Sequence, residues 1–278
     1  MNLNDLLLPA VNASVEAGRK INQVQKFALN IRIKQDNSPV TVADMEAQKI
    51  ILNYLNNTDL PVISEESENV DYKLRKNFLY YWLVDPLDGT KEFINNRDGY
   101  TVNIALIKKD TPVAGVIYAP AMDELFFNFP GDRSYKIINP VDKYISAEDL
   151  KIASEPISTG EEKDILRIVA SKSHLNEKTN QFIEDVSKLV AKTEIINIGS
   201  SLKFCLIAEG KADIYPRFGP TMEWDTGAGH AIAEAAGCEV LKSENLKPLV
   251  YNKLNLKNPE FVVFRVPSLY EKYHKLFG

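Results

Sequence analysis

Two aspartates, Asp85 and Asp88, end the apolar run of the segment WLVDPLDGT at residues 82–90, and Thr90 closes it. The run is typical of a buried strand, and such a strand can end in two carboxylates only if their charge is balanced nearby. Pro86 restricts the backbone between the aspartates, so that both side chains and one carbonyl can face inward. A polar turn is the alternative, because Asp-Gly is a common turn pair. That alternative explains Asp88 but leaves Asp85 unexplained.

Further acidic residues stand at the ends of apolar runs elsewhere in the chain. Glu65 follows one short run, and Asp225 opens a segment rich in glycine and alanine. Carboxylates about 5 Å apart repel by roughly 3 kcal/mol per pair at an effective dielectric constant near 20, so a group of them takes up protons or binds cations. Carboxylate oxygens select Mg²⁺ rather than zinc. Together with Asp85 and Asp88, these residues would supply enough oxygens for two or three Mg²⁺ ions, but the spacing alone leaves their convergence open.

The composition is that of a globular protein with one large domain or two closely packed ones. The chain has 278 residues, of which 45% are hydrophobic and 26% charged. Its net charge of −5, from 33 basic and 38 acidic residues, argues against a broad nucleic-acid-binding face, so we expect no nucleic-acid partner. A small anionic ligand stays compatible with this charge, because metal ions and a few local cations outweigh the global sign.

Several features bear on the compartment. The two cysteines are too few for a disulfide framework and fit a reducing cytosol. The N-terminal residues lack a basic region and include Asp5, which argues against a signal peptide. No apolar run approaches the length of a transmembrane segment. We therefore expect a cytoplasmic protein, a monomer or a homodimer, with peripheral association at the inner face of the membrane left open.

The apolar spacing predicts two lobes that differ in their pattern of elements. In the first half it predicts helices over 4–28 and 43–57 and strands over 79–84, 101–107, 113–118 and 124–129. The short connections between these strands favour an antiparallel sheet. In the second half it predicts strands over 166–170, 194–198 and 212–215 and helices over 178–189, 201–209 and 225–236. We expect an N-terminal α+β lobe over 1–135, with most of the metal ligands, and a C-terminal α/β lobe over 136–278.

Several segments resemble, in order and spacing, a known superfamily of phosphatases. The segments DNSPVTVAD (36–44), SEE (64–66), WLVDPLDGT (82–90) and WD (224–225) resemble the signatures of the Mg²⁺-dependent, lithium-sensitive inositol monophosphatase-like superfamily. The segments DGTKEF (88–93), SKSH (171–174), GSSLKFC (199–205) and YPRFGP (215–220) are similar to its 3′(2′),5′-bisphosphate nucleotidase branch. The resemblance runs from about residue 5 to 260. It implies a layered αβαβα sandwich, which agrees with the predicted order of elements.

The resemblance also implies roles for the acidic residues. The first Mg²⁺ would be held by Glu65, Asp85 and the Leu87 carbonyl, and the second by Asp85, Asp88 and Asp225, with Glu65 reaching a third, weaker ion. Asp44 and Thr90 resemble the pair that orients a water and accepts its proton. Two alternatives are open: Thr90 as a helix N-cap, and Asp44 as a cap or ion-pair partner of its own helix.

The resemblance implies that the substrate is a small nucleotide bisphosphate. Its contacts would be His174, Ser200, Lys203 and Arg217, together with Glu65, Leu87, Asp88, Gly89, Thr90 and Asp225. The alternatives are an ordinary serine cap beside a solvated lysine, a solvated loop arginine and a surface histidine.

The expected reaction removes the 3′-phosphate of adenosine 3′,5′-bisphosphate, giving AMP and phosphate, and extends to the related phosphosulfate, in sulfur assimilation. An inositol or sugar monophosphatase is the first alternative, against which Lys91, Glu92 and the Arg217 segment weigh. A non-catalytic Mg²⁺-linked binding protein is the second. Against it stands the presence of Asp44, Thr90 and every expected metal ligand.

Overall fold

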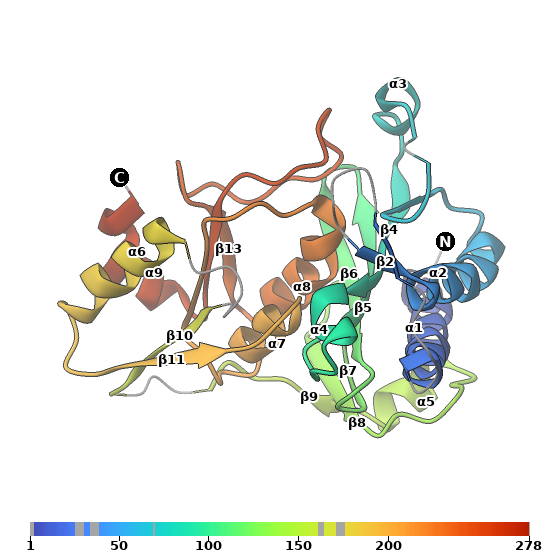
Figure 1. Cartoon of the computed structure of the whole chain (residues 1–278), viewed down its shortest axis with the longest axis horizontal. Helices are drawn as coiled ribbons and strands as arrows, with labels where there is room; N and C mark the ends of the chain where they lie inside the picture. Colours follow the sequence, from blue (N-terminus) through green and yellow to red (C-terminus); the bar gives the residue numbers. More distant parts are fainter. Residues whose placement is uncertain are drawn as a thin grey trace.

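The protein forms five alternating layers of helices and sheets, shown from the side in Figure 1. The computed structural model describes residues 3–25, 31–33, 39–68, 70–160, 164–170 and 176–277. Helices α1 and α2 cover one face of a seven-stranded sheet, and α7 and α8 lie between this sheet and a five-stranded one. Helices α6 and α9 lie on the outer face of the second sheet. The predicted αβαβα sandwich is therefore confirmed.

The seven-stranded sheet has the order β3-β4-β5-β6-β7-β8-β9. Only the β3–β4 pair is parallel; the other pairs are antiparallel, as predicted. The strands are β3 (Val62–Ser64), β4 (Tyr80–Asp88), β5 (Thr101–Lys108), β6 (Thr111–Ala119), β7 (Glu124–Asn128), β8 (Ser134–Ile138) and β9 (Glu155–Pro156). The strands β3, β8 and β9 were not predicted. Strands β8 and β9 belong to the first sheet and lie across or beyond residue 135. The division of the chain into two lobes at that residue stays a prediction.

The five-stranded sheet has the order β11-β10-β12-β14-β13. Strand β10 is parallel to β11 and β12, whereas β14 is antiparallel to β12 and β13. The strands are β10 (Leu166–Ala170), β11 (Thr193–Asn197), β12 (Ile214–Arg217), β13 (Glu239–Lys242) and β14 (Phe261–Phe264). The first three were predicted, and the last two were not.

The helices predicted from the sequence lie at nearly the predicted positions, although residues 26–28 of the first prediction lie outside the described residues. They are α1 (Leu3–Gln25), α2 (Val42–Leu55), α6 (Glu177–Ser187), α7 (Leu202–Ala208) and α8 (Glu223–Ala235). The shorter elements were not predicted: β1 (Ile31–Ile33), β2 (Pro39–Thr41), α3 (Tyr72–Arg75), α4 (Thr90–Ile94), α5 (Ala147–Ile152), α9 (Pro267–Tyr273) and the 3₁₀ turns Asn56–Thr58 and His274–Phe277. Among the helices of the described ranges, none is both long and apolar enough to cross a membrane.

Alternation along β4 explains how the layers hold together. Trp82 and Val84 point into the core shared with α1 and α2. Leu83 points into the opposite core, which α7 and α8 close. Helix α8 lies very close to the sheet at Gly115 of β6, where an added Cβ would stand 2.2 Å from the Ala228 carbonyl oxygen. This close packing fixes the position of α8 relative to β4.

Candidate active site

The end of β4 is irregular, and this irregularity places its acidic residues. The pairing of β4 with β5 shifts register between Asp85 and Asp88. Pro86 offers no N–H to the ladder, and the Leu87 N–H instead donates to Asp85 Oδ1 at 3.0 Å. Gly89 then turns the chain into α4 with a φ of +88°, and a side chain there would lie 2.9 Å from a neighbouring carbonyl oxygen. The bulge and the left-handed glycine turn the chain sharply at the end of the strand.

Carboxylates from three separate elements meet at this point. Ligand atoms of Glu65, Asp85 and Asp225 all lie within 4.8 Å of one another. Glu65 reaches the site because β3 runs parallel to β4 and the Glu65 N–H donates to the Val84 carbonyl at 3.1 Å. Asp225 lies in the first turn of α8, where its Oδ2 accepts from the Met222 N–H at 2.9 Å. The structure thus supplies the convergence that spacing had left open.

The pKa values of these carboxyls are raised. Burial raises the pKa of Asp85 well above its usual range, with further contributions from the charges of Glu65, Asp88 and Asp225. Burial, together with the charge of Asp88, also raises the pKa of Asp225 well above its usual range. Burial also raises the pKa of Asp88, to about 6, although Lys203 opposes the shift. Crowded carboxylates of this kind, with Asp85 buried and Glu65, Asp88 and Asp225 partly buried, are a donor set that fits Mg²⁺, whose charge would relieve their repulsion.

These pKa shifts predict how the stability of the metal-free protein depends on pH. A carboxyl with a raised folded-state pKa binds its proton more tightly in the folded chain than in the unfolded one. For Asp88, stability should therefore fall as the pH rises from about 4, the unfolded value, to about 6, the folded one, and the penalty should stay constant above. Mg²⁺ should then raise the melting temperature more at pH 8 than at pH 5, as measured by scanning calorimetry against EDTA. Equal shifts at the two pH values would contradict this explanation.

Asp44 and Thr90 meet beside the carboxylates. The Thr90 hydroxyl lies 3.5 Å from Asp44 Oδ1 and 3.2 Å from the Leu87 carbonyl oxygen. Thr90 is the first residue of α4 and Gly89 is the N-cap, so the alternative of Thr90 as a cap is wrong. Asp44 takes part in capping its own helix as the N3 residue of a capping box with the N-cap Thr41: its Oδ2 accepts from the backbone N–H and hydroxyl of Thr41 at 2.7 and 2.6 Å. These bonds orient Asp44 while Oδ1 faces Thr90.

Basic and polar side chains form the opposite side of the site. Lys203 is only 4% exposed, and its Nζ donates to the Ser200 carbonyl at 2.6 Å, so the alternative of a solvated lysine is wrong. Burial lowers the pKa of Lys203 to about 8, against the charge of Asp88. Arg217 ends β12 and donates to the Pro220 carbonyl at 3.0 Å. Within the described ranges, Ser200 Oγ and Arg217 Nε are buried donors without a hydrogen-bond partner. Such donors can bind an anionic group.

A cavity of about 230 Å³ joins the two sides. Its lining includes Glu65, Asp88, Gly89, Thr90, Ser200, Lys203, Arg217 and Asp225. Tyr215 also lines it and was not predicted. Tyr215 lies two residues before Arg217 on a strand, so the two side chains lie on the same face of the sheet. This spacing could have identified Tyr215 as a residue of the site. Asp44, Asp85 and Leu87 lie next to this cavity, whereas His174 lies outside the described residues.

Comparisons with known proteins agree with this geometry. The sequence pattern of the inositol monophosphatase family matches residues 2–273. The chain is 43% identical to the 3′(2′),5′-bisphosphate nucleotidase CysQ of Salmonella typhimurium over 81% of this chain and 85% of that one. It is 42% identical to the protein of the same name from Escherichia coli K12 over 89% of this chain and 94% of that one. The crystal structure of CysQ from Bacteroides thetaiotaomicron superimposes with a TM-score of 0.84 at 45% identity, covering 92% and 95% of the two chains.

Proposed function

This chain belongs to the inositol monophosphatase family, and we propose that it is a Mg²⁺-dependent 3′(2′),5′-bisphosphate nucleotidase. It would convert adenosine 3′,5′-bisphosphate to AMP and phosphate, and adenosine 3′-phosphate 5′-phosphosulfate to adenosine 5′-phosphosulfate, in sulfur assimilation. The observation that carries the proposal is one cavity with converging carboxylates on one side and two basic groups, the buried Lys203 and the partly buried Arg217, on the other. The names of the curated relatives support the choice of substrate. We also propose a cytoplasmic location for the protein.

The metal centre would be held by oxygens from the ends of three elements. The ligands would be Glu65, Asp85, Asp88, Asp225 and the Leu87 carbonyl, for two to three Mg²⁺ ions. When bound, Mg²⁺ would neutralise these carboxylates and act as a Lewis acid toward the phosphoryl oxygens.

The residues of the chain itself would orient the reactants. Asp44 and the Thr90 hydroxyl would hold the attacking water and accept its proton. The water oxygen forms a bond to phosphorus as the bond from phosphorus to the ribose 3′-oxygen breaks, and the ribose oxygen leaves with a proton. The N–H groups of Gly89 and Thr90 would donate to the phosphate oxygens in this step.

Arg217 and Lys203 would bind the second phosphate, and this assignment makes a prediction. Arg217→Ala should raise KM for adenosine 3′,5′-bisphosphate by about 10- to 100-fold, the worth of one hydrogen bond to a charged group. Adenosine 3′-monophosphate has no 5′-phosphate and serves as the matched control substrate, whose KM should change by less than about threefold. An equal effect on both substrates would show that Arg217 does not recognise the second phosphate.

One panel of phosphate-release assays tests the proposed function. The substrates are adenosine 3′,5′-bisphosphate, its phosphosulfate analogue and inositol 1-phosphate, each with Mg²⁺ and with EDTA. We expect Mg²⁺-dependent release and a preference for the nucleotides. Preference for inositol 1-phosphate would favour an inositol monophosphatase instead, and no release from any substrate would favour a binding protein.

A further inference from the structure

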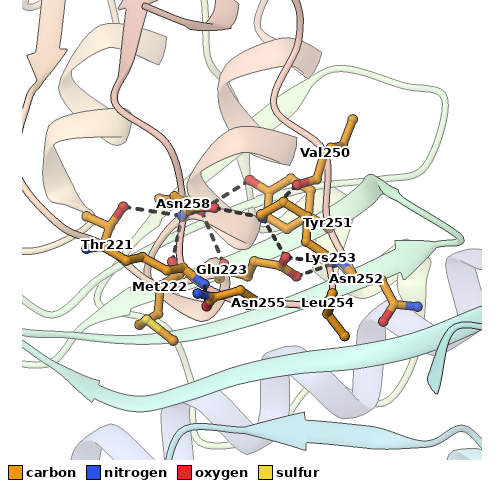
Figure 2. A network of polar contacts seen from close by, with 12 residues as sticks. Thr221, Met222, Glu223, Val250, Tyr251, Asn252, Lys253, Leu254, Asn255 and Asn258 are labelled. Atoms are coloured by element: carbon orange, nitrogen blue, oxygen red, sulfur yellow. Dashed lines mark hydrogen bonds and ion pairs between the residues drawn. The ribbon is translucent and has the colours of Figure 1, made fainter. Parts of the chain in front are cut away.

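The first turn of α8, which carries Asp225, is held by a segment that lies outside the cavity. This segment, residues 250–258, runs between β13 and β14 and crosses the N-terminus of α8 (Figure 2). Met222 is the N-cap of α8 and makes no side-chain capping bond. The methionine side chain has no oxygen that could accept an N–H of the first turn. The Glu223 N–H instead donates to the Leu256 carbonyl, and the turn has further partners in the 250–258 segment.

Asn258 supplies the first of these partners. It is 6% exposed, and its Nδ2 lies 2.7 Å from the Met222 carbonyl oxygen and 2.9 Å from the Thr226 hydroxyl. Its backbone N–H donates to the Thr221 carbonyl at 2.8 Å. The side-chain amide therefore joins the residue before α8 to its first turn; Figure 2 shows the contact with Met222.

Glu223 and Lys253 form the second connection. Glu223 is fully buried, and its carboxylate accepts from the N–H groups of Asn252 and Lys253 at 2.6 and 3.0 Å. Lys253 Nζ donates to the same carboxylate at 2.6 Å, and it lies 3.3 Å from Asn258 Oδ1. In return, the Glu223 N–H donates to the Leu256 carbonyl at 2.9 Å. If Lys253 moved away, the charge of the buried Glu223 carboxylate would be left uncompensated, which is costly. The ion pair therefore holds the 250–258 segment against the start of α8.

Met222 transmits this constraint to the carboxylate of Asp225. Its carbonyl accepts from Asn258, and its own N–H donates to Asp225 Oδ2 at 2.9 Å. Met222 also forms an antiparallel bridge with Lys257. The peptide groups that orient Asp225 are therefore fixed by the 250–258 segment rather than by the cavity.

The same segment is also tied to α3. Arg75 ends α3, the short helix that follows the Glu65 turn, and is 3% exposed. Its Nη1 donates to Asn252 Oδ1 at 2.8 Å and its Nη2 to the Leu254 carbonyl at 2.9 Å. Asn252 Nδ2 donates back to the Arg75 carbonyl at 2.7 Å. The 250–258 segment thus connects α8, which carries Asp225, to α3, which begins seven residues after Glu65.

We propose that Asn258 and the Glu223–Lys253 pair are positioning residues for the metal centre: through Met222 they hold the Asp225 carboxylate in the orientation that binds Mg²⁺. The inference rests on the proposed function. It adds that the affinity for Mg²⁺ is set in part by residues that touch neither metal nor substrate.

The test compares two buried asparagines, Asn258 and Asn12, whose side chains each form hydrogen bonds to backbone groups of another segment. Asn258→Ala should weaken Mg²⁺ binding at least about tenfold, as measured by isothermal titration calorimetry without substrate. The Mg²⁺ concentration for half-maximal activity should rise in parallel, while kcat at saturating Mg²⁺ stays within about threefold of wild type. Asn12 is the control: it is 4% exposed and joins α1 to the Tyr144 backbone through two bonds of 2.9 Å. Asn12→Ala should lower the melting temperature but leave Mg²⁺ affinity within about twofold.

The outcomes separate this inference from the proposed function. If wild type binds Mg²⁺ and Asn258→Ala binds it equally well, the positioning role is wrong and the proposed function stands. If both variants weaken binding alike, the effect is general destabilisation and the positioning role is also wrong. If the wild-type chain binds no Mg²⁺, the proposed metal centre and this inference fall together. Asn258→Asp, which keeps the size of the side chain and removes the Nδ2 donor, replaces the alanine variant if that variant does not fold, and the same tenfold loss is expected.

Discussion

Asp85→Asn is expected to reduce Mg²⁺-dependent phosphate release by about 10⁴-fold in kcat/KM, equivalent to about 5 kcal/mol. Asp85 would contribute to both principal ions, and it lies with Glu65 and Asp225 in one cluster. An amide cannot replace the charge of a shared carboxylate ligand. Steady-state phosphate release over a range of Mg²⁺ concentrations measures the effect.

The same substitution should stabilise the metal-free protein. Asp85 is 2% exposed, and burial together with neighbouring charges raises its pKa. Removing its charge relieves repulsion at pH 8, so the melting temperature in EDTA should rise while the increase caused by Mg²⁺ should largely vanish. Asp185→Asn is the control, because Asp185 is a partly exposed residue of α6 that contacts Gln181 and Lys188 and does not line the cavity. Turnover near the wild-type level in Asp85→Asn would show that Asp85 is not a metal ligand.

Thr90→Ala is expected to lower kcat by about 10²- to 10⁴-fold, the usual worth of a positioned proton-transfer group. The Thr90 hydroxyl lies between Asp44 Oδ1 and the Leu87 carbonyl, so its loss removes the contact that would orient the water. The affinity for Mg²⁺ should change little, because the assigned ligands stay in place. Stopped-time phosphate assays and calorimetry on the same preparation measure the two quantities.

Thr90→Ser is the matched variant for this role. It keeps the hydroxyl and loses only a methyl group, so it should retain kcat within about tenfold of wild type. Asp44→Asn is less informative, because Asp44 is also the N3 residue of the capping box at the start of α2, so the substitution alters the helix start as well as the proposed proton acceptor. If the serine variant were as inactive as the alanine variant, the hydroxyl would not be the group that acts.

Elements with strong periodicity could be predicted from the sequence, and short elements fixed by distant partners could not. Helix α1 and strands β4 to β7 carry clear apolar periods over many residues. The segment 261–264, FVVF, is buried on both faces, since Val263 and Val262 belong to different cores. Its strand character depends on pairing with β12 and β13. A run of four apolar residues does not show this by itself.

The candidate site shows the same limit. The aspartates at the end of β4 stood out because they follow a buried run. Their meeting with Glu65 and Asp225 depends on the parallel β3–β4 pair and on the close packing of α8 against β6, which are contacts between distant residues. The burial of Lys203 was likewise invisible, since a lysine near a helix start is usually solvated.

Gly227 shows how packing can reverse an expectation from helix propensity. Glycine within a helix should cost about 1 kcal/mol of helix stability relative to alanine. In the structure, a Cβ at Gly227 would lie 3.1 Å from Leu83 Cδ2 and 3.2 Å from Ala105 Cβ. Glycine therefore relieves a tight contact between α8 and the sheet, which offsets its low propensity.

The most direct test of the metal centre is anomalous diffraction from crystals grown with Mn²⁺ in place of Mg²⁺. We expect at least one anomalous peak within about 2.5 Å of carboxylate oxygens from Glu65, Asp85 and Asp225. A second peak should lie beside Asp88. Fully occupied Mn²⁺ elsewhere on the protein, with no anomalous density between these carboxylates, would contradict the account.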